Sequence, residues 1–258
     1  MPTLNSWGNQ VLAANVTLNG GTCNIGSDAT SGAINIGTGA AARTVTVGNG
    51  TGASSVVLNC GTGALNLGSN AIARTTTLGN TTGASVLALK YGTGDFTLAS
   101  ATGTVMSALD TGELTYPLQP SFLAYPDADR LNVTGNGTKY GLICNTELYD
   151  RNADYNTGTG AFVAPVAGVY HFSFLVRMVQ GGATNFTNLA LEKNGVEFAI
   201  TYTDLSSGSY VFCMLCAYNL LAAGDSILPY VTCVGAGGNT MDIFGTQAGS
   251  TFAGHLVC

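Results

Sequence analysis

Apolar and polar residues alternate with a period of two along much of the chain, most clearly in the segment that follows Gly168. There Tyr170, Phe172 and Phe174 share one face, and the residues between them occupy the other. Strict alternation with aromatic residues on one face is typical of a half-buried antiparallel strand. The polar, Gly-rich run before it, Asn152–Gly160, predicts a loop. The pattern therefore indicates an all-β protein with many tight turns.

The first hundred residues repeat with a period of 31. Residues 33–63 align with residues 64–94, so that Arg43 corresponds to Arg74, and a third copy begins at Asp95. Each copy holds three short alternating segments separated by Gly-rich turns, which predicts three short strands per copy. In the first copy the apolar positions are Ile34, Ile36, Val45, Val47, Val56, Leu58 and Cys60.

Two or three apolar residues per strand are too few for one copy to stand alone. Their burial does not offset an ordering cost of about 1–2 kcal/mol per residue. Either the coils of one chain stack in a β-solenoid, or three chains wind around a common axis. The repeats also resemble the Gly-Thr-Gly-rich repeats of phage tail fibres and bacterial adhesins.

The second half of the chain resembles the C1q-domain family. The residues at the spacing of the family signature are Asp150, Tyr155, Phe162, Gly168, Tyr170, Phe172 and Phe174. One position departs, because Cys144 stands where the family usually has Phe. Three later segments also match: Leu191–Gly195 resembles a strand ending in Asn-Gly, Leu221–Asp225 resembles a turn, and Ser250–Leu256 resembles the closing strand. This resemblance covers Gln119–Cys258.

The resemblance implies a trimeric jelly-roll β-sandwich head, related in shape to tumour necrosis factor. A threefold head favours a threefold repeat region over a single-chain solenoid. We therefore expect an all-β chain with a trimeric β-repeat shaft, of the triple β-helix or β-spiral kind, over residues 1–116. The C1q/TNF-like head is expected over residues 117–258, because prolines near Tyr116–Pro120 break regular structure there.

Composition excludes some partners. Only 9% of the residues are charged, the net charge is −6 and the pI is about 4.6. No basic cluster is present, so we expect no nucleic-acid partner. No apolar run is long enough for membrane insertion, and the N-terminus lacks the features of a signal peptide. We expect the N-terminus to be attached to a larger particle or stalk.

Residues suited to chemistry are sparse. His171 and His255 are expected at outward or interface positions on strands, without partners for a catalytic site. The chain has no persuasive acidic pair for a depolymerase, so we expect no enzyme activity. Cys213 and Cys216 lie on one predicted strand, where residues three apart face opposite ways, which argues against a metal site. We expect the free cysteines to be buried as small hydrophobic residues.

No cofactor or metal site is predicted from the residues themselves. Asp127 and Asp129 form an acidic pair without the Gly and Glu that complete a calcium loop. Because several C1q-like heads bind calcium, the resemblance implies that the head could bind this ion.

Counting strands back from Cys258 places three polar loops at the tip of the head, namely Gln180–Asn185, Asp204–Ser207 and Gly235–Gly249. Such loops on a rigid sandwich often carry recognition. The candidate binding residues are Gln180, Asn185, Asp204, Ser206, Asn239, Asp242 and Gln247. Their amides and low charge would suit glycans. The residues expected in the core or the trimer interface are Tyr155, Phe162, Tyr170, Phe172, Phe174 and Phe252.

These features predict a homotrimeric fibre whose C-terminal head attaches to a host cell or surface by binding a glycan or protein receptor. We expect a virus or phage fibre, facing outward from the virion surface. One alternative is a trimeric adhesin on a bacterial cell surface. Another is a purely structural spike, whose head only drives trimerisation.

Overall fold

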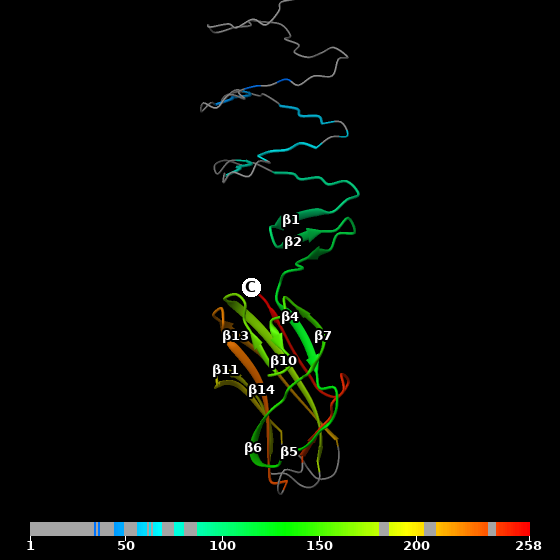
Figure 1. Ribbon diagram of the computed structural model, residues 1–258, viewed down its shortest axis with the longest axis vertical. Helices are drawn as coiled ribbons and strands as arrows, with labels where there is room; N and C mark the ends of the chain where they lie inside the picture. Colours follow the sequence, from blue (N-terminus) through cyan, green and yellow to red (C-terminus); the bar gives the residue numbers. More distant parts are fainter. Residues whose placement is uncertain are drawn as a thin grey trace, which may run out of the picture. The chain divides into compact units, whose positions relative to one another are not determined.

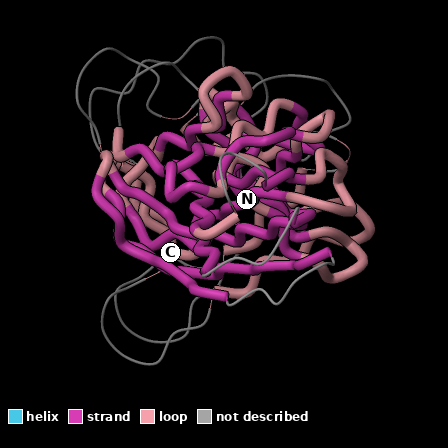
Figure 2. The backbone as a smooth tube through the Cα atoms, turned by 90° about the horizontal axis from the view of Figure 1, so that it is seen from below, coloured by secondary structure: helices cyan, strands magenta, loops and turns pink. Residues whose placement is uncertain are grey.

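The computed structural model describes residues 87–180, 186–203, 210–236 and 241–258, together with 34, 36, 44–48, 56–60, 62, 64–68 and 75–79. Every described residue lies in a strand, turn or loop, as the colouring of Figure 2 shows. The chain divides into two compact units, Met1–Val86 and Leu87–Cys258. This division falls before residue 116, where the sequence places the boundary between shaft and head. That boundary stays a prediction.

The second unit begins with a small three-stranded antiparallel sheet. It is formed by β1 (Phe96–Ser100), β2 (Gly103–Ala108) and β3 (Leu114–Thr115). Strands β1 and β2 follow Gly94, where the second repeat copy ends, and they pair with each other within the single chain. The remainder of the unit is an antiparallel β-sandwich of the jelly-roll kind, as predicted (Figure 1).

Two sheets form the sandwich. In the seven-stranded sheet the order is β5-β15-β10-β16-β4-β7, with β13 on the free side of β10 over most of its length. Its strands are β4 (Ser121–Tyr125), β5 (Arg130–Thr134), β7 (Thr146–Arg151), β10 (Gly168–Gln180), β13 (Tyr210–Leu221), β15 (Met241–Ile243) and β16 (Thr251–Leu256).

The five-stranded sheet has the order β12-β11-β14-β9-β8. Its strands are β8 (Tyr155–Asn156), β9 (Ala161–Val163), β11 (Phe186–Lys193), β12 (Val196–Thr203) and β14 (Ser226–Val234). The remaining strand, β6 (Asn136–Gly141), lies beside β14.

Aromatic rings fill the space between the two sheets. The predicted alternation of β10 is confirmed, because Tyr170, Phe172 and Phe174 are fully buried while the residues between them are only partly buried. The Phe122 ring stacks on that of Tyr155, with centroids 4.7 Å apart. Phe162 and Phe252 are also fully buried and contact the Phe122 ring. Stacked and edge-to-face rings of this kind stabilise a core beyond the area they bury.

The expected turns are present where the C1q-like segments end. Asn194 and Gly195 have φ values of 51° and 81°, which suit the tight turn joining β11 to β12. In the second turn the Asp225 carboxylate accepts a 2.7 Å hydrogen bond from the Ala222 amide and pairs with Lys193. These contacts lower the pKa of Asp225 to about 2, Lys193 having the largest effect. The carboxylate therefore holds the turn over the whole physiological pH range.

Both ends of the sandwich segment meet at one end of the fold, here called the base. The C-terminus lies beside the start of β4 (Figure 1). The Leu256 amide donates to the Pro120 carbonyl at 3.0 Å, and the Val169 amide donates to the carbonyl of Cys258 at 2.8 Å. The register of β10 therefore places Gln180 at the opposite end, called the tip, where it faces Met241. The strand ends that flank the three predicted loops, at Gln180, Thr203 and Val234, lie at the tip as expected.

The predicted loop 235–249 contains a strand that the sequence interpretation missed. β15 pairs with β10 and β5, with Met241 and Ile243 buried. Its Met-Asp-Ile alternation is only three residues long, too short to be distinguished from a turn by pattern alone. Asp242 therefore lies on a strand.

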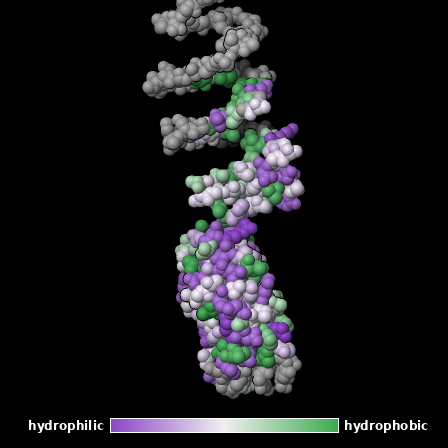
Figure 3. Space-filling view, turned by 45° about the vertical axis from the view of Figure 1, so that its right-hand side comes forward, coloured by the Kyte–Doolittle hydropathy of each residue, from purple (hydrophilic) through white to green (hydrophobic). Residues whose placement is uncertain are grey.

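In the repeat unit, the described segments recur with the period of the sequence. Gly48 and its equivalent Gly79 have φ values of 100° and 97°. Segments 44–47 and 75–78 both lack regular secondary structure, and no backbone hydrogen bond joins two described residues before Tyr91. The strands predicted for these segments depend on neighbouring coils or chains and therefore stay a prediction. Their apolar side chains lie open on the surface (Figure 3).

Close packing at Gly254 supports a prediction about the core. A Cβ at this position would lie 2.6 Å from Phe172 Cδ1 and 2.8 Å from Phe122 Cε1. We expect Gly254→Ala to lower the free energy of unfolding by about 1–3 kcal/mol, as overpacked cores do. Denaturant unfolding measures this change. Gly94→Ala, whose nearest neighbour would be 3.9 Å away, is the matched control. An unchanged midpoint for Gly254→Ala would contradict the packing described.

Candidate functional site

The outer face of the seven-stranded sheet carries an exposed apolar surface, here called the apolar face. It is centred on β13, whose outward residues alternate with buried ones. Phe212 is 57% exposed and Leu220 is 68% exposed in the single chain. The large apolar residues that β13 contributes are Tyr210, Phe212, Met214, Tyr218 and Leu220. A contiguous patch of this kind on a soluble protein marks an interaction surface.

The strand register arranges this face in rows. One row contains Cys216, Ser173, Ala253, Leu123 and Tyr149 on successive strands, and the next toward the tip contains Met214, Leu175 and Thr251. These rows are largely apolar. The row nearer the base is different, since it contains Tyr218, His171, His255, Ser121 and Arg151. We call it the histidine row.

At the tip end of the face, Arg177 lies among aromatic rings. Its guanidinium carbon is 4.3 Å from the ring centroids of both Tyr210 and Phe244, and 5.5 Å from that of Phe212. The Arg177 amide donates to the Ser250 hydroxyl at 3.2 Å, which fixes the backbone there. Cation–π contacts of this kind allow a positive charge to lie within an apolar surface.

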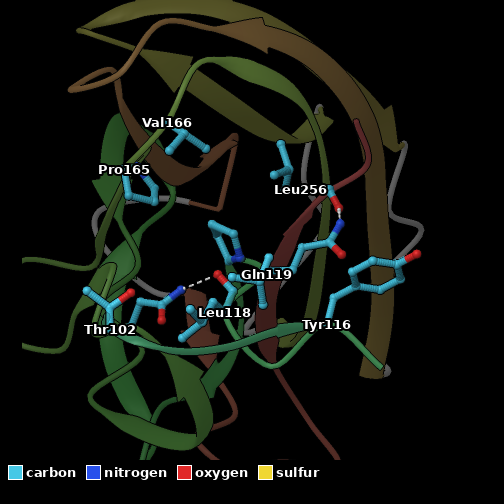
Figure 4. A pocket seen from close by; sticks show the side chains of 10 residues that line it. Thr102, Tyr116, Leu118, Gln119, Pro165, Val166 and Leu256 are labelled. Carbon is cyan, nitrogen blue, oxygen red and sulfur yellow. Dashed lines mark hydrogen bonds between the residues drawn. The ribbon is translucent and has the colours of Figure 1, made fainter. Parts of the chain in front are cut away.

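Two cavities open at the base. The larger has a volume of about 480 Å³ and is lined mainly by apolar side chains, among them Val105, Pro165, Val166 and Leu256 (Figure 4). Its amide side chains already have partners, since Gln119 donates to the Leu256 carbonyl and Asn152 to the Leu118 carbonyl. The smaller cavity, about 240 Å³, includes Arg151 and His255.

Two carboxylates lie close together beside β8. The Asp150 carboxylate accepts hydrogen bonds from the amides of Asp154 at 3.3 Å and Tyr155 at 3.0 Å. Asp154 Oδ2 is buried and has no hydrogen-bond partner. Burial, and secondarily the charge of Asp150, raises the pKa of Asp154 to about 6. The hydrogen bonds of Asp150 hold the loop of the family signature in place, and neither aspartate lines one of the two cavities.

The structure locates only some of the predicted binding residues. Gln180 ends β10 beside β15, and Gln247 lies exposed in the turn before β16. The Asp242 carboxylate accepts a 2.7 Å hydrogen bond from the Asn132 amide, so it helps to hold β15 against β5. The candidates outside the described residues are Asn185, Asp204, Ser206 and Asn239. Their roles in binding stay predictions.

The six aromatic residues predicted for the core or trimer interface all lie between the sheets, and none lies on the apolar face. The exposed fraction of each side chain is between 0% and 4% for Tyr155, Phe162, Tyr170, Phe172, Phe174 and Phe252. Sequence reasoning missed the outward residues of β13 instead. The alternation of Tyr210, Phe212, Met214 and Tyr218 with small or apolar residues was the available signal.

Cysteines and acidic residues are placed as follows. Cys213 is buried and Cys216 is exposed, so they face opposite sides of β13 as predicted. Cys144 and Cys233 are also buried, whereas the expectation of burial is wrong for Cys60, Cys216 and Cys258. Asp127 pairs with Arg130, and Asp129 accepts from the Gly245 amide at 2.9 Å. Among the described residues no three His, Cys, Asp or Glu side chains gather as metal ligands would.

Comparison with known families decides the identity of the sandwich. The model of the C1q domain matches residues 129–257, which is half of the chain. The chain belongs to the C1q domain family. C1q domains are often trimeric and involved in binding, are typically not enzymes, and typically occur in secreted or extracellular proteins. No curated protein matches the chain in sequence. Within the described part, no helix is long and apolar enough to cross a bilayer.

Two solved structures illustrate the similarity. Murine APRIL, in a crystal structure at pH 5.0, is 11% identical with a TM-score of 0.43, and the match covers 54% of this chain and 99% of that one. The globular domain of a zebrafish complement 1qA protein is 18% identical with a TM-score of 0.37. That match covers 54% of this chain and 98% of the other.

The raised pKa of Asp154 predicts a pH-dependent stability. The folded state binds the Asp154 proton more tightly than the unfolded state, so stability falls as pH rises from about 4 to about 6. We expect Asp154→Asn to raise the denaturation midpoint above that of the wild type near neutral pH. The difference should shrink toward about pH 4, where the wild-type carboxyl is protonated. An equal difference at both pH values would contradict the assignment.

Proposed function

We propose that the protein is a homotrimer that attaches to a surface through its C1q domain. The observation that carries the proposal is the apolar face. Phe212, Met214 and Leu220 project outward from β13 beside Leu175 of β10, with no other part of the described chain covering them. Burial of such side chains stabilises association by about 1.5–3 kcal/mol each when they become fully enclosed. A second and third copy of the same face would enclose them, and closed symmetry satisfies all copies equally.

The repeat unit supports the same assembly. Ile34, Val45, Val47 and Leu58 are all more than half exposed, and so are Leu65, Leu78 and Leu89, the second-copy equivalents of three of them. Their backbone has no hydrogen-bond partner among the described residues. Three parallel chains around one axis would supply both the missing backbone partners and the apolar contacts. We propose that residues 1–116 form such a threefold shaft and that residues 117–258 form the head.

Attachment by three heads on one shaft follows from effective concentration. Once one head binds, the other two search only a small volume, so weak contacts combine into strong adhesion. The tip carries polar groups low in charge, including the exposed Gln247, which suits glycans or a protein receptor. A fibre on a virus or phage particle, with its N-terminus joined to that particle, uses all of these properties. A bacterial surface adhesin would use them in the same way.

Oligomerisation through the apolar face can be tested by substitution. We expect Phe212→Asp to dissociate the trimer, because a carboxylate buried in an apolar interface leaves an unpaired charge. The matched control is Tyr202→Asp on the five-stranded sheet, where the aromatic ring is 64% exposed. Analytical ultracentrifugation should show single chains for Phe212→Asp and trimers for Tyr202→Asp. Dissociation of both variants, or of neither, would contradict this location of the interface.

Attachment by avidity makes a separate prediction. On a printed glycan array, the wild-type chain should bind at least about 10²-fold more tightly than the Phe212→Asp chain, because the variant has one head per particle. Tyr202→Asp should bind like the wild type. Equal binding by all three chains would show that multivalency has no part in attachment. A trimer that binds no glycan and no host cell would favour the structural spike instead.

A further inference from the structure

The histidine row lies within the face that the proposed homotrimer would bury. His171 and His255 are direct partners on β10 and β16, and their ring centroids are 5.3 Å apart. The Tyr218 ring lies 4.6 Å from that of His171 on the other side. At these distances neutral imidazoles pack as flat rings, whereas two imidazolium ions repel each other.

A positive charge already stands at the end of this row. Arg151 lies opposite Ser121, which in turn lies opposite His255, and Arg151 shares the smaller cavity with that histidine. The Arg151 guanidinium donates to the carbonyl of Tyr116 at 3.3 Å, which holds it there. Protonated histidines would therefore add to a positive charge on the same surface.

Negative charge on the described part of this face is remote from the two histidines. The titratable or charged groups that the packed strands present outward, besides the two histidines, are Tyr210, Cys216 and Tyr218 on β13, Arg177 on β10, Asp242 on β15, Tyr125 on β4, and Glu147, Tyr149 and Arg151 on β7. Asp242 pairs with Val179 at the tip end of β10, far from the histidine row. Glu147 lies opposite Ala124, well along the sheet from the histidine row. Asp150 turns its carboxylate toward the amides of Asp154 and Tyr155. No described carboxylate side chain is placed to neutralise an imidazolium here.

We propose that the histidine row makes the trimer acid-sensitive: the three chains stay associated while His171 and His255 are neutral and separate when both take up protons. This inference rests on the homotrimer proposed above. Enclosing the face removes water from both rings, and an ion without a compensating partner is costly in such a place. Three copies bring six imidazoles and three Arg151 side chains into one interface, so the repulsion accumulates.

The direction of the pH dependence follows because the associated chains favour neutral histidines. Partial burial, and secondarily the neighbouring His171, lowers the pKa of His255 even in the single chain. The associated state therefore binds fewer protons than the separated chains. Its stability is fully present above about pH 6.5 and is lost as pH falls toward about 5.

The composition of the chain makes the effect of the histidine row easy to separate from that of other titratable groups. The protein has only two histidines, and both lie in the row. Asp154, whose pKa is raised to about 6 mainly by burial, is not on the apolar face. Its protonation favours the folded head, so its effect on acidification has the opposite sign.

Sedimentation of the full chain between about pH 7.5 and 5 tests the proposal. We expect wild type to sediment as three chains at the upper pH and as single chains with folded heads at the lower, with a midpoint near pH 6. The variant His171→Gln/His255→Gln should remain trimeric throughout, and Asp154→Asn should follow wild type. Near-ultraviolet circular dichroism of the aromatic core of the head, largely unchanged between the two pH values, distinguishes separation of the chains from unfolding of the head.

Three outcomes would overturn the proposal. One is a wild-type trimer that persists at about pH 5, and another is a double variant that separates together with the wild type. The third is acid unfolding without a separated, folded intermediate. Single wild-type chains at about pH 7.5 would instead contradict the homotrimer itself, and this inference with it.

Discussion

Surfaces without a partner in the single chain dominate this protein. In the repeat unit, segments such as 44–47 and 75–78 have no backbone partner among the described residues and expose their apolar residues. In the second unit, β13 presents a row of large apolar side chains outward. Unpaired backbone groups and open apolar surface are both costly, and association removes both costs together. The proposed function follows from how three copies would share these surfaces.

The C1q domain has a closely packed interior of its own, without any partner chain. Its interior is a continuous aromatic cluster, in which Phe122 contacts Tyr155, Phe162 and Phe252. Gly254 leaves room for these rings, since any side chain there would meet Phe172 and Phe122. The head can thus be rigid before it associates, and a rigid head presents its apolar face with little further ordering cost. Strands β1 and β2, which follow the second repeat copy, also pair within the chain.

Much of the sandwich could be predicted from the sequence because alternation and turn residues are local signals. Tyr170, Phe172 and Phe174 specified β10, and Asn194-Gly195 specified a tight turn. Three features could not be read in this way. β15 is too short to show a period, the short apolar segments of the repeats do not specify which strands pair, and the partners of His171 and Asp242 come from distant strands. Long-range register decides these contacts, and no local pattern encodes it.

The outward face of β13 shows how the same pattern can be interpreted in two ways. The sequence predicted a strand around Cys213 and Cys216, and the structure shows that its outward face is also apolar, at Phe212, Met214 and Leu220. A strand that is apolar on both faces is typical of one buried on both sides. The aromatic residues named from the sequence for the core or interface all lie in the core, because the family signature belongs to β10 and its neighbours between the sheets.

The number of chains in the native particle is the most direct test of this account. Native mass spectrometry of the full-length wild-type protein near neutral pH measures it without any substitution. Shared apolar surfaces predict a mass three times the 26.2 kDa of one chain. A stably folded particle with the mass of a single chain would contradict the account, because the apolar face and the repeats would then remain open to water.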